Sequence, residues 1–365
     1  MSKVLVAMSG GVDSSVTAAL LRDRGYECIG CTMKLFDGAG GDDPGEKSCC
    51  TAEDAEFARS VAYSSEMPYY VFNFKDDFKK TVIKDFGDNY LHGRTPNPCI
   101  VCNREMKFGK LFRMGAELGC DYMATGHYAR VVNENGRFVL KKAADRTKDQ
   151  SYVLYFLTQE QLARVLFPLG ELTKTQVRAI AEEKRFRNAK KPDSQDICFV
   201  PDGDYAGFLS RVLPVAPPPG DFVNADGDVL GTHGGIINYT IGQRKGLGIS
   251  AAAPLYVKRI DAERNRVVLG WADEMFDSVC ILSDVNWIPG DVPTEPVRCA
   301  VRIRYHHKEQ PAAVFPLPDG GARVVFDEPV RAITPGQAAV FYDGDTVLGG
   351  GTIVSVPAGS EETQK

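Results

Sequence analysis

The sequence lacks a long apolar run, an export signal and a strong excess of one charge. No stretch approaches the ~20 consecutive apolar residues that a membrane-spanning helix requires, so no membrane partner is expected. The apolar run at residues 3–8 is too short for a secretory signal, and the Ser9-Gly10-Gly11 that follows does not resemble a cleavage site. We therefore expect a cytoplasmic protein whose ten cysteines are reduced thiols, not a disulfide framework.

The charge is nearly balanced, with a net of −5 from 43 basic and 48 acidic residues. This total does not by itself indicate a nucleic-acid partner. The distribution is uneven, because residues 37–56 hold seven acidic residues and one lysine, whereas residues 137–191 hold thirteen Lys/Arg against six Asp/Glu. Such a basic band is typical of a phosphate-backbone contact and also of an ordinary solvated helix surface, and charge alone leaves both open.

The first part of the chain reads as an α/β domain. The length of 365 residues corresponds to about two to three domains. Residues 1–205 alternate short apolar runs with helical patterns, which predicts a parallel sheet with helices on both faces. Expected strands lie at 3–8, 28–35, 69–74 and 121–125, and expected helices at 14–22 and 52–64. Thr173 and Gln176 have the spacing of a capping box and predict a helix to about Lys184.

The sequence pattern changes in the second half of the chain, from alternating strands and helices to short β-like runs. Residues 214–220 hold four prolines and a glycine, which marks a linker or boundary. Beyond it, short β-like runs at 267–269, 297–305, 322–326 and 338–342 are separated by Asp-Gly turns. We expect residues 206–278 to form a small central domain, residues 279–358 a C-terminal β-barrel, and residues 359–365 a flexible tail.

The strongest local motif is a glycine loop between the first strand and the first helix. Two glycines allow a tight turn and close approach to a ligand, and the helix N-terminus presents free N–H groups to an anion. No Gly-Lys-Ser/Thr follows, so the loop is not a Walker A motif. Ser-Gly-Gly-x-Asp-Ser is instead the PP-loop signature of ATP pyrophosphatases; the alternative is an ordinary turn capped by Asp13 or Ser14. The predicted ATP-binding residues here are Met8, Ser9, Gly10, Gly11, Val12, Asp13, Ser14 and Ser15.

Two further positions are candidates for the nucleotide pocket. Met33, in the second expected strand, either covers the adenine or belongs to the core. Gly126 and His127 follow the strand at 121–125, and ligands of parallel sheets bind at the carboxyl ends of the strands. Beside a PP-loop, Gly126 is expected to approach the nucleotide with His127 next to it.

The cysteines suggest several chemistries. Cys99 and Cys102 form a Cys-x-x-Cys pair, which is compatible with a redox pair, half of a metal site or coincidence. Cys28 and Cys31 lie in an expected strand, where alternation places them on opposite faces and favours packing. Zinc binding by these pairs together with Cys49 and Cys50 stays open, although the spacing is not that of a zinc ribbon.

Cys198 stands apart from these pairs. It follows the basic segment that contains Arg187, Lys190 and Lys191, whose charges favour a thiolate; the alternative is an apolar cysteine packed before Phe199. The remaining cysteines are expected in the core: Cys120, Cys280 and Cys299.

The motifs in order resemble one family, the tRNA-specific 2-thiouridylases of the PP-loop ATP pyrophosphatase superfamily. The likeness runs from about residue 3 to about residue 355. It is carried by the glycine loop and by six further segments. These are Gly-Arg-Thr-Pro-Asn-Pro at 93–98, Cys-Asn at 102–103, Ala-Thr-Gly-His-Tyr at 124–128, Lys-Asp-Gln-Ser-Tyr at 148–152, Ser-Gln-Asp-Ile-Cys-Phe at 194–199 and Gly-Gln-Arg-Lys-Gly-Leu-Gly at 242–248.

The resemblance implies a tRNA-modifying sulfurtransferase. ATP, expected with Mg²⁺, adenylates the C2 oxygen of the wobble uridine at position 34, and sulfur then replaces the activated oxygen to give 2-thiouridine, AMP and pyrophosphate. Cys198 would carry the persulfide, and Cys102 would be the nucleophile that ends in a transient disulfide with Cys198. Such a bond requires Cα atoms ~4.4–6.8 Å apart, so the fold must bring the two loops together.

The resemblance also implies partners and contacts. These are tRNA, with glutamate, glutamine and lysine acceptors, and a sulfur-relay or cysteine desulfurase protein as persulfide donor. The residues that match the family's target-base and tRNA contacts are Asn97, Pro98, Cys99, His127, Lys148, Asp149, Gln150, Arg304, Tyr305 and Gln337. Extruding a base from its stack is the expected way to reach it.

One position departs from the family pattern. Many members carry Asp where this chain has Cys99, and an unperturbed thiol, with a pKa of ~8.5, is a poor substitute for a carboxylate. Three other functions compete with the thiolase: a PP-loop ligase acting on a small molecule, a non-catalytic RNA-binding protein, and an iron–sulfur thiolase, which needs a three-cysteine cluster. The ligase does not explain Cys102, Cys198 or the basic band.

Overall fold

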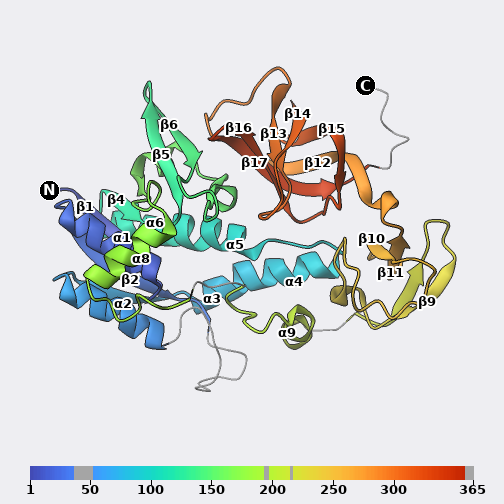
Figure 1. Ribbon diagram of the computed structural model, residues 1–365, viewed down its shortest axis with the longest axis horizontal. Helices are drawn as coiled ribbons and strands as arrows, with labels where there is room; N and C mark the ends of the chain where they lie inside the picture. The colour runs from blue at the N-terminus through green and yellow to red at the C-terminus, as the bar shows by residue number, and fades with distance from the viewer. Residues whose placement is uncertain (37–51, 193–196, 214–216, 358–365) are drawn as a thin grey trace.

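The computed structural model describes residues 1–36, 52–192, 197–213 and 217–357. Its N-terminal part is built on a five-stranded, fully parallel sheet in the order β3-β2-β1-β4-β7 (Figure 1). The strands are β1 Lys3–Ala7, β2 Glu27–Lys34, β3 Tyr69–Asn73, β4 Tyr122–Ala124 and β7 Val165–Leu166. Continuous apolar runs such as β1 are what a sheet covered on both faces requires. The predicted parallel sheet is confirmed.

Helices cover both faces of this sheet, as predicted. In β1, Val4 and Val6 pack with α1 and α2 on one face, whereas Leu5 packs with the helices of the other face. The first face carries α1 Val12–Asp23 and α2 Ala52–Ser64, with α8 Lys174–Glu183 packed on α1. The second group comprises α3 Lys75–Phe78, η1 Lys79–Ile83, α4 Lys84–Leu91, α5 Pro98–Val101, η2 Cys102–Leu111 and α6 Phe112–Glu117. The helix expected at 14–22 begins two residues earlier, at Val12.

Several local predictions are confirmed at the level of single residues. Thr173 accepts a hydrogen bond from the backbone N–H of Gln176, and the side chain of Gln176 returns to the N–H of Thr173, which completes the capping box of α8. A second capping box, at Thr158, begins α7 Gln159–Arg164 and was not predicted. Two short helices complete this part: η3 Ser151–Leu154 and α9 Tyr205–Val212.

The middle part is a small four-stranded sheet in the order β10-β11-β8-β9. Its elements are β8 Gly220–Val223, β9 Val229–His233, η4 Ile236–Asn238, β10 Tyr256–Asp261, β11 Arg266–Gly270 and η5 Asp273–Met275. It has its own apolar cluster, centred on Phe222, Val257 and Val267. Helix α4 runs from the N-terminal sheet toward this part and contacts η4 (Figure 1).

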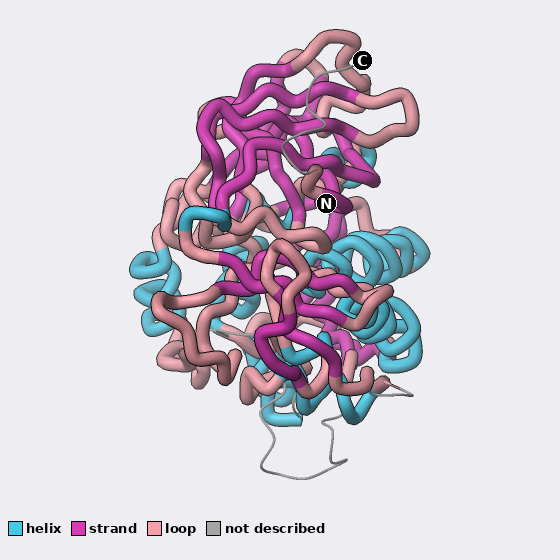
Figure 2. Tube along the Cα trace, turned by 90° about the vertical axis from the view of Figure 1, so that its right-hand side faces the viewer, coloured by secondary structure: helices cyan, strands magenta, loops and turns pink. Residues whose placement is uncertain are grey.

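The C-terminal part is a closed antiparallel β-barrel, seen as the strand-rich upper half of Figure 2. Its strands are β12 Phe276–Trp287, β13 Val297–Arg302, β14 Gln310–Pro316, β15 Ala322–Arg331, β16 Ala338–Asp343 and β17 Thr346–Ser355. Pairing of β12 with β17 closes the barrel and removes its edges. The predicted fold class, an α/β domain followed by a small central domain and a C-terminal barrel, is confirmed.

The parts are joined in a way that the sequence did not indicate. A hairpin, β5 Ala129–Glu134 and β6 Arg137–Lys142, leaves the N-terminal sheet after β4 and extends the barrel sheet by pairing Lys141 with Thr346. Helix α9 packs Phe208 and Leu209 into the largest cluster of the N-terminal part, although it lies beyond residue 205. Within the described ranges no helix is both long and apolar enough to cross a bilayer.

Candidate active site

The glycine loop connects the end of β1 to the first turn of α1. Gly10 has φ +76°, and a Cβ atom there would lie 2.3 Å from the backbone oxygen of Asp54 in α2, so only glycine fits. Gly11 is the N-cap residue and adds no side-chain cap, which leaves the N–H groups of the first turn to be satisfied by the loop or a ligand. Ser14 Oγ accepts from the N–H of Ser9 at 3.2 Å and thereby closes the loop onto the helix.

A buried asparagine supports the loop from behind. Asn188 Nδ2 donates to the backbone oxygen of Gly10 at 2.8 Å and to Ser15 Oγ at 2.9 Å. Asn188 follows α8, and three residues later Lys191 pairs with Asp54 of α2. The segment that leads toward Cys198 is therefore fixed to the loop and to α2 before residues 193–196, which lie outside the described ranges.

Asp13 connects the loop to two distant segments of the chain. Its carboxylate accepts the hydroxyl of Tyr128 at 2.8 Å and the ammonium of Lys174 at 2.7 and 2.9 Å. Gly126 lies against the same turn, since a Cβ there would come within 2.9 Å of the Asp13 carbonyl carbon and the Ser14 nitrogen. The structure therefore brings Gly126 to the loop, as expected for a site at the carboxyl ends of β1 and β4.

The two methionines of the expected pocket are both buried. Met8 directly follows β1 and packs in the cluster beneath α1 and α2, while its backbone N–H donates to the oxygen of Cys31 at 2.7 Å. Met33 lies in β2 and is 9% exposed, in the cluster on the opposite face. These surroundings fit a core residue, and a role of Met33 over the adenine stays a prediction.

His127 follows Gly126 and is enclosed. Its Nδ1 lies 2.6 Å from Thr125 Oγ1, and its ring stands 5.9 Å from that of Phe108 and 6.0 Å from that of Phe167. Burial, and secondarily the charge of Lys107, holds the pKa of His127 well below the usual 6.5. The imidazole is neutral at physiological pH, and can therefore both donate and accept a hydrogen bond.

Cys99 and Cys102 lie on one helical turn. Asn97 is the N-cap of α5 and accepts from the N–H of Cys99 at 3.1 Å, and Pro98 occupies the first position, where its missing N–H costs nothing. Cys99 is exposed, and Cys102 is half-buried at the first residue of η2. Asn103, which is buried, donates to the backbone oxygen of Val153 at 3.2 Å and so fixes the orientation of this turn.

Cys198 lies at the rim of the same apolar cluster as Cys102. Both are half-buried and pack against it, and Phe199 anchors the Cys198 segment with edge contacts to Phe78 and Phe86, whose ring centroids are 5.6 and 5.4 Å away. All eight cysteines of the described ranges are thiols.

The other cysteines behave as core residues. Cys28 and Cys31 face opposite sides of the sheet, as predicted, and burial raises the pKa of Cys28 to about 11. Within the described ranges no three His, Cys, Asp or Glu residues are arranged to hold a metal ion. The zinc hypothesis also involved Cys49 and Cys50, which lie outside those ranges. Cys120 and Cys280 are buried and Cys299 is half-buried.

The turn at residues 145–150 is tied to the loop and to the barrel. Gln150 and Tyr128 exchange two hydrogen bonds, at 2.9 and 3.0 Å, and Tyr128 in turn reaches Asp13. Asp149 is buried: it accepts from the N–H of Ala143 at 3.0 Å and lies 3.6 Å from Arg302 of the barrel. Lys148 is half-buried on this turn.

Arg304, Tyr305 and Gln337 lie where the three parts meet. Arg304 donates to the backbone oxygens of Ile241, at 3.0 Å, and Ala332, at 3.2 Å. The Tyr305 hydroxyl donates to the backbone oxygen of Asp149 at 3.1 Å. Gln337 Nε2 donates to the oxygen of Thr95 at 2.8 Å, two residues before Asn97. Gln337 thus joins the barrel to the segment that leads to Cys99, Tyr305 joins it to the turn at Asp149, and Arg304 joins it to the middle part.

The basic band is largely neutralised by ion pairs. Arg137, Lys142, Arg146, Lys174 and Lys184 each lie within 2.8 Å of a carboxylate oxygen. Binding of a phosphate backbone by this band stays a prediction.

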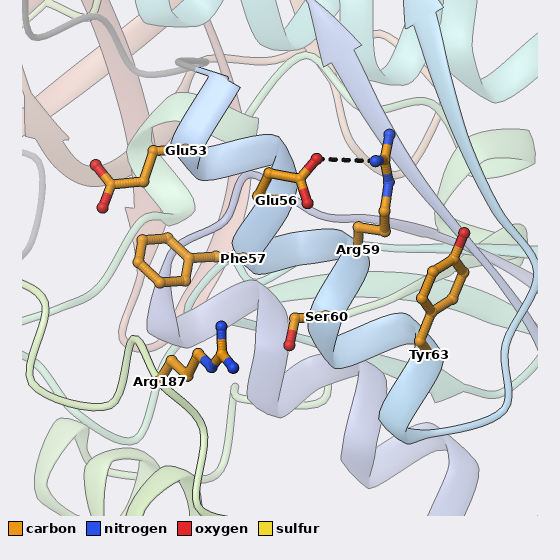
Figure 3. A pocket seen from close by; sticks show the side chains of 7 residues that line it. All are labelled: Glu53, Glu56, Phe57, Arg59, Ser60, Tyr63 and Arg187. Atoms are coloured by element: carbon orange, nitrogen blue, oxygen red, sulfur yellow. Dashed lines mark hydrogen bonds and ion pairs between the residues drawn. The ribbon is translucent and has the colours of Figure 1, made fainter.

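A separate pocket lies on the outer side of α2 (Figure 3). Its volume is 490 Å³, and its lining residues are Glu53, Glu56, Phe57, Arg59, Ser60, Tyr63 and Arg187. Glu56 and Arg59 pair with each other at 2.8 Å, as Figure 3 shows. Of the residues named in the sequence analysis, Arg187, a cation expected to favour the Cys198 thiolate, lines this pocket.

Three side chains of the site were missed by sequence reasoning. Lys174 was noticed only as part of the capped helix, Tyr128 only as part of a motif, and Lys107 not at all. The capping box does place Lys174 at the first position of α8, but only the packing of α8 on α1 brings it to Asp13.

Family models match three consecutive parts of the chain. They are described as the tRNA methyl transferase HUP domain, at residues 2–202, the tRNA methyl transferase PRC-barrel domain, at 206–271, and the aminomethyltransferase β-barrel domain, at 277–353. These matches define the class: a HUP domain that carries the glycine loop, followed by a PRC-barrel domain and a β-barrel domain.

Relatives of known name are similar over nearly the whole chain. The tRNA-specific 2-thiouridylase MnmA of Acetivibrio thermocellus is 52% identical over 96% of this chain and 99% of its own length. The enzyme of that name from Halothermothrix orenii is 50% identical over 97% of this chain and 99% of its own length. The one from Carboxydothermus hydrogenoformans is 52% identical over 96% of this chain and 97% of its own length. The chain belongs to the tRNA-specific 2-thiouridylase family, which confirms the resemblance drawn from its motifs.

One solved structure with a more distant sequence is similar over part of the chain. A 4-thiouridine synthetase–RNA complex with bound ATP is 18% identical, with a TM-score of 0.36 over 58% of this chain and 50% of that chain. A likeness at that level has no bearing on function.

Proposed function

We propose that this protein replaces the C2 oxygen of the wobble uridine of tRNA with sulfur, in two steps driven by ATP. It is a tRNA-uridine 2-sulfurtransferase, as its family membership supports. The family models are described by the word methyl transferase, but the relatives that cover nearly the whole chain are named for thiolation. The observation that carries the proposal is the glycine loop, with Asp13 held by Lys174 and Tyr128. The same chain places Cys102 one turn into the helix that begins at Pro98.

The first step is adenylation of the uridine. The loop and the N-terminus of α1 offer backbone N–H groups and hydroxyls to the triphosphate. The C2 oxygen attacks the α-phosphorus, the bond to the β-phosphate oxygen breaks, and pyrophosphate leaves. A carbonyl oxygen is a poor leaving group and AMP a good one, so this step prepares C2 for substitution.

The glycine loop contains one carboxylate, that of Asp13, which could bind Mg²⁺. Mg²⁺ prefers oxygen ligands and binds by one or two carboxylates together with substrate phosphates. Asp13 supplies a carboxylate at the loop and fits such a role, with its oxygens now paired with Lys174 and Tyr128. When bound with the nucleotide, the ion would neutralise phosphate charge.

The second step transfers sulfur. A persulfide on Cys198 attacks C2, the C2–O bond breaks, and AMP leaves with the oxygen. The Cys102 thiolate then attacks Sγ of Cys198, the S–S bond to the base breaks, and 2-thiouridine is released with a Cys102–Cys198 disulfide left behind. An external thiol reduces this disulfide. We propose a sulfur-relay or cysteine desulfurase protein of the cytoplasm as the persulfide donor.

The tRNA contacts are proposed around the Cys99 turn. Asn97, Pro98 and Cys99 would lie against the extruded base, with neutral His127 beside it, and Lys148 and Gln150 against the backbone. Asp149, Arg304, Tyr305 and Gln337 would contribute to RNA binding mainly by holding the barrel in place, since each makes a contact between parts of the chain. Acceptors for glutamate, glutamine and lysine are the proposed substrates.

An iron–sulfur thiolase is the competing candidate, and the described residues do not favour it. Cys99 and Cys102 lie on one helical turn, but within the described ranges no three His, Cys, Asp or Glu residues are arranged to hold a metal ion. Iron and sulfide analysis of anaerobically purified protein, with its visible spectrum, distinguishes the candidates. A brown protein with about three to four irons per chain favours the cluster, and a colourless active protein favours the persulfide.

The experiment that tests the proposed function uses unmodified tRNA and α-labelled ATP. Without a sulfur donor, label should become attached to tRNA and pyrophosphate should be released. With a persulfide donor, label should leave as AMP in step with 2-thiouridine, detected by mass spectrometry of the nucleosides. Release of γ-phosphate without pyrophosphate would contradict the adenylation step.

A further inference from the structure

Lys107 is aligned with Cys102 by an unusual helix. The two residues belong to η2, a π-helix in which hydrogen bonds run between residues five apart. Residue i+5 therefore lies roughly one turn above residue i. On an α-helix the same residues would be about 140° apart around the axis. The π-helical winding thus places the Lys107 side chain on the side of η2 that carries Cys102.

The surroundings of Lys107 are partly apolar and short of negative charge. Its neighbours Met106 and Phe108 are buried, and Lys107 itself is half-buried. Over the described ranges, no carboxylate pairs with Lys107 and no acceptor receives its ammonium. The other cations of this helix differ, because Arg104 pairs with Glu105 and Lys110 with Asp77. A cation without a carboxylate partner can be paired by a ligand that supplies the negative charge.

Lys107 also lies close to the nucleotide side of the site. The ring of the adjacent residue Phe108 lies 5.9 Å from that of His127, and His127 follows Gly126, which abuts Asp13 and Ser14 of the glycine loop. Lys107 thus lies on the helix that carries Cys102 and packs, through Phe108, on the segment that follows Gly126. In the proposed reaction one anionic group is common to both steps: the α-phosphate, which is present in ATP, in the adenylated uridine and in AMP. The β- and γ-phosphates belong to the loop and leave after the first step.

We propose that Lys107 binds the α-phosphate of the nucleotide and of the adenylated base. The proposal rests on the proposed function and adds a ligand to it. In the first step the oxygen–phosphorus bond forms and the bond to pyrophosphate breaks while the ammonium stays protonated and neutralises the equatorial oxygens. In the second step the C2–O bond breaks, and the same ammonium holds the departing AMP. No proton moves to or from Lys107.

The test compares Lys107→Met, Lys107→Arg and Arg113→Met. Arg113 is an exposed cation of α6, the continuation of the same helix, and Arg113→Met removes one charge without touching the site. Adenylation of tRNA is followed with α-labelled ATP and no sulfur donor. Lys107→Met should lower kcat for adenylation by about 100-fold, as loss of one charge-stabilising group does. Lys107→Arg should keep much of the rate, and Arg113→Met should stay within about twofold.

Two further readouts separate the outcomes. AMP binding without tRNA, by equilibrium dialysis, should weaken in Lys107→Met while the thermal midpoint stays near wild type, which a merely structural role does not predict. Equal adenylation rates and AMP affinities in Lys107→Met and Arg113→Met would overturn the proposal, as would an effect confined to KM for tRNA. If wild type binds AMP through Lys107 but never labels tRNA, the proposed function fails and this ligand assignment stands.

Discussion

The ammonium nitrogen of Lys174 lies 2.7 and 2.9 Å from the two carboxylate oxygens of Asp13, and so joins the start of α8 to the start of α1. Lys174 is also held by its backbone N–H, which donates to Asp145 Oδ2 at 2.9 Å. The glycine loop is therefore linked to the turn that carries Lys148 by Lys174 on one side and by Tyr128 and Gln150 on the other.

Removing the Lys174 charge should weaken nucleotide binding. In Lys174→Met the Asp13 carboxylate loses its cation and repels the triphosphate, so the Kd for ATP, measured by calorimetry, should rise by about tenfold. This corresponds to ~1.4 kcal/mol. Lys184→Met is the matched control, because Lys184 ends the same helix and pairs with Asp23, far along α1 from the loop. Equal ATP affinities in the two variants would contradict this role for Lys174.

Gly10→Ala should abolish the loop geometry. The new Cβ would lie 2.3 Å from the Asp54 oxygen at a φ of +76°, so the loop or α2 must move. We expect loss of measurable ATP binding and a lowered thermal midpoint. Gly25→Ala provides the comparison, since Gly25 has φ +82° and nothing within 4 Å. In that variant the free energy of unfolding should fall by only the ~1 kcal/mol that alanine requires in the left-handed conformation, and ATP binding should be kept.

Asp149→Ala should loosen the joint between the barrel and the N-terminal part. The buried carboxylate accepts from the N–H of Ala143 and from the hydroxyl of Ser151 at 2.8 Å, and it faces Arg302. Its loss leaves buried donors without a partner, so the free energy of unfolding should fall by ~3 kcal/mol in urea. Asp327→Ala, which breaks an exposed pair with Arg298, should leave the urea midpoint unchanged. A wild-type midpoint for Asp149→Ala would show that its interactions are unimportant for stability.

His127 should make stability fall on acidification. Its pKa is lowered by burial, and then by Lys107, well below the unfolded value of about 6.5. Between the two pKa values the unfolded chain binds one proton more than the folded chain at this residue, so the free energy of unfolding rises with pH in that window. The contribution of neutral His127 to stability is therefore lost as the pH falls below about 6.5. The urea midpoint should drop between pH 7.5 and pH 5, and less steeply in His127→Gln. His233 and His307, whose pKa values are also lowered by burial, should account for the remaining slope.

Much of the fold could be predicted because it depends on local pattern. The order of strands and helices follows apolar periodicity, the start of α8 follows the Thr173 and Gln176 spacing, and the opposite faces of Cys28 and Cys31 follow strand alternation. These features are set within a few residues, so spacing alone indicates them.

The rest of the site depends on contacts between distant residues. The pairing of Lys174 with Asp13 spans 161 positions, and nothing in either segment specifies it. The π-helical winding of η2 could not be predicted either, because its hydrogen-bond register is decided by packing and its residues suit an α-helix equally well. The hairpin that joins the barrel through Lys141 and Thr346 is of the same kind.

The two-cysteine sulfur transfer is tested most directly by measuring how much 2-thiouridine forms in unmodified tRNA with ATP and a persulfide donor. The measurement compares wild type with Cys102→Ser, Cys198→Ser and Cys99→Ser. The account predicts that the first two variants lose activity and that Cys99→Ser keeps it. Thiolation at the wild-type rate by Cys198→Ser would contradict the persulfide assignment, and loss of activity in Cys99→Ser together with bound iron would favour the iron–sulfur route.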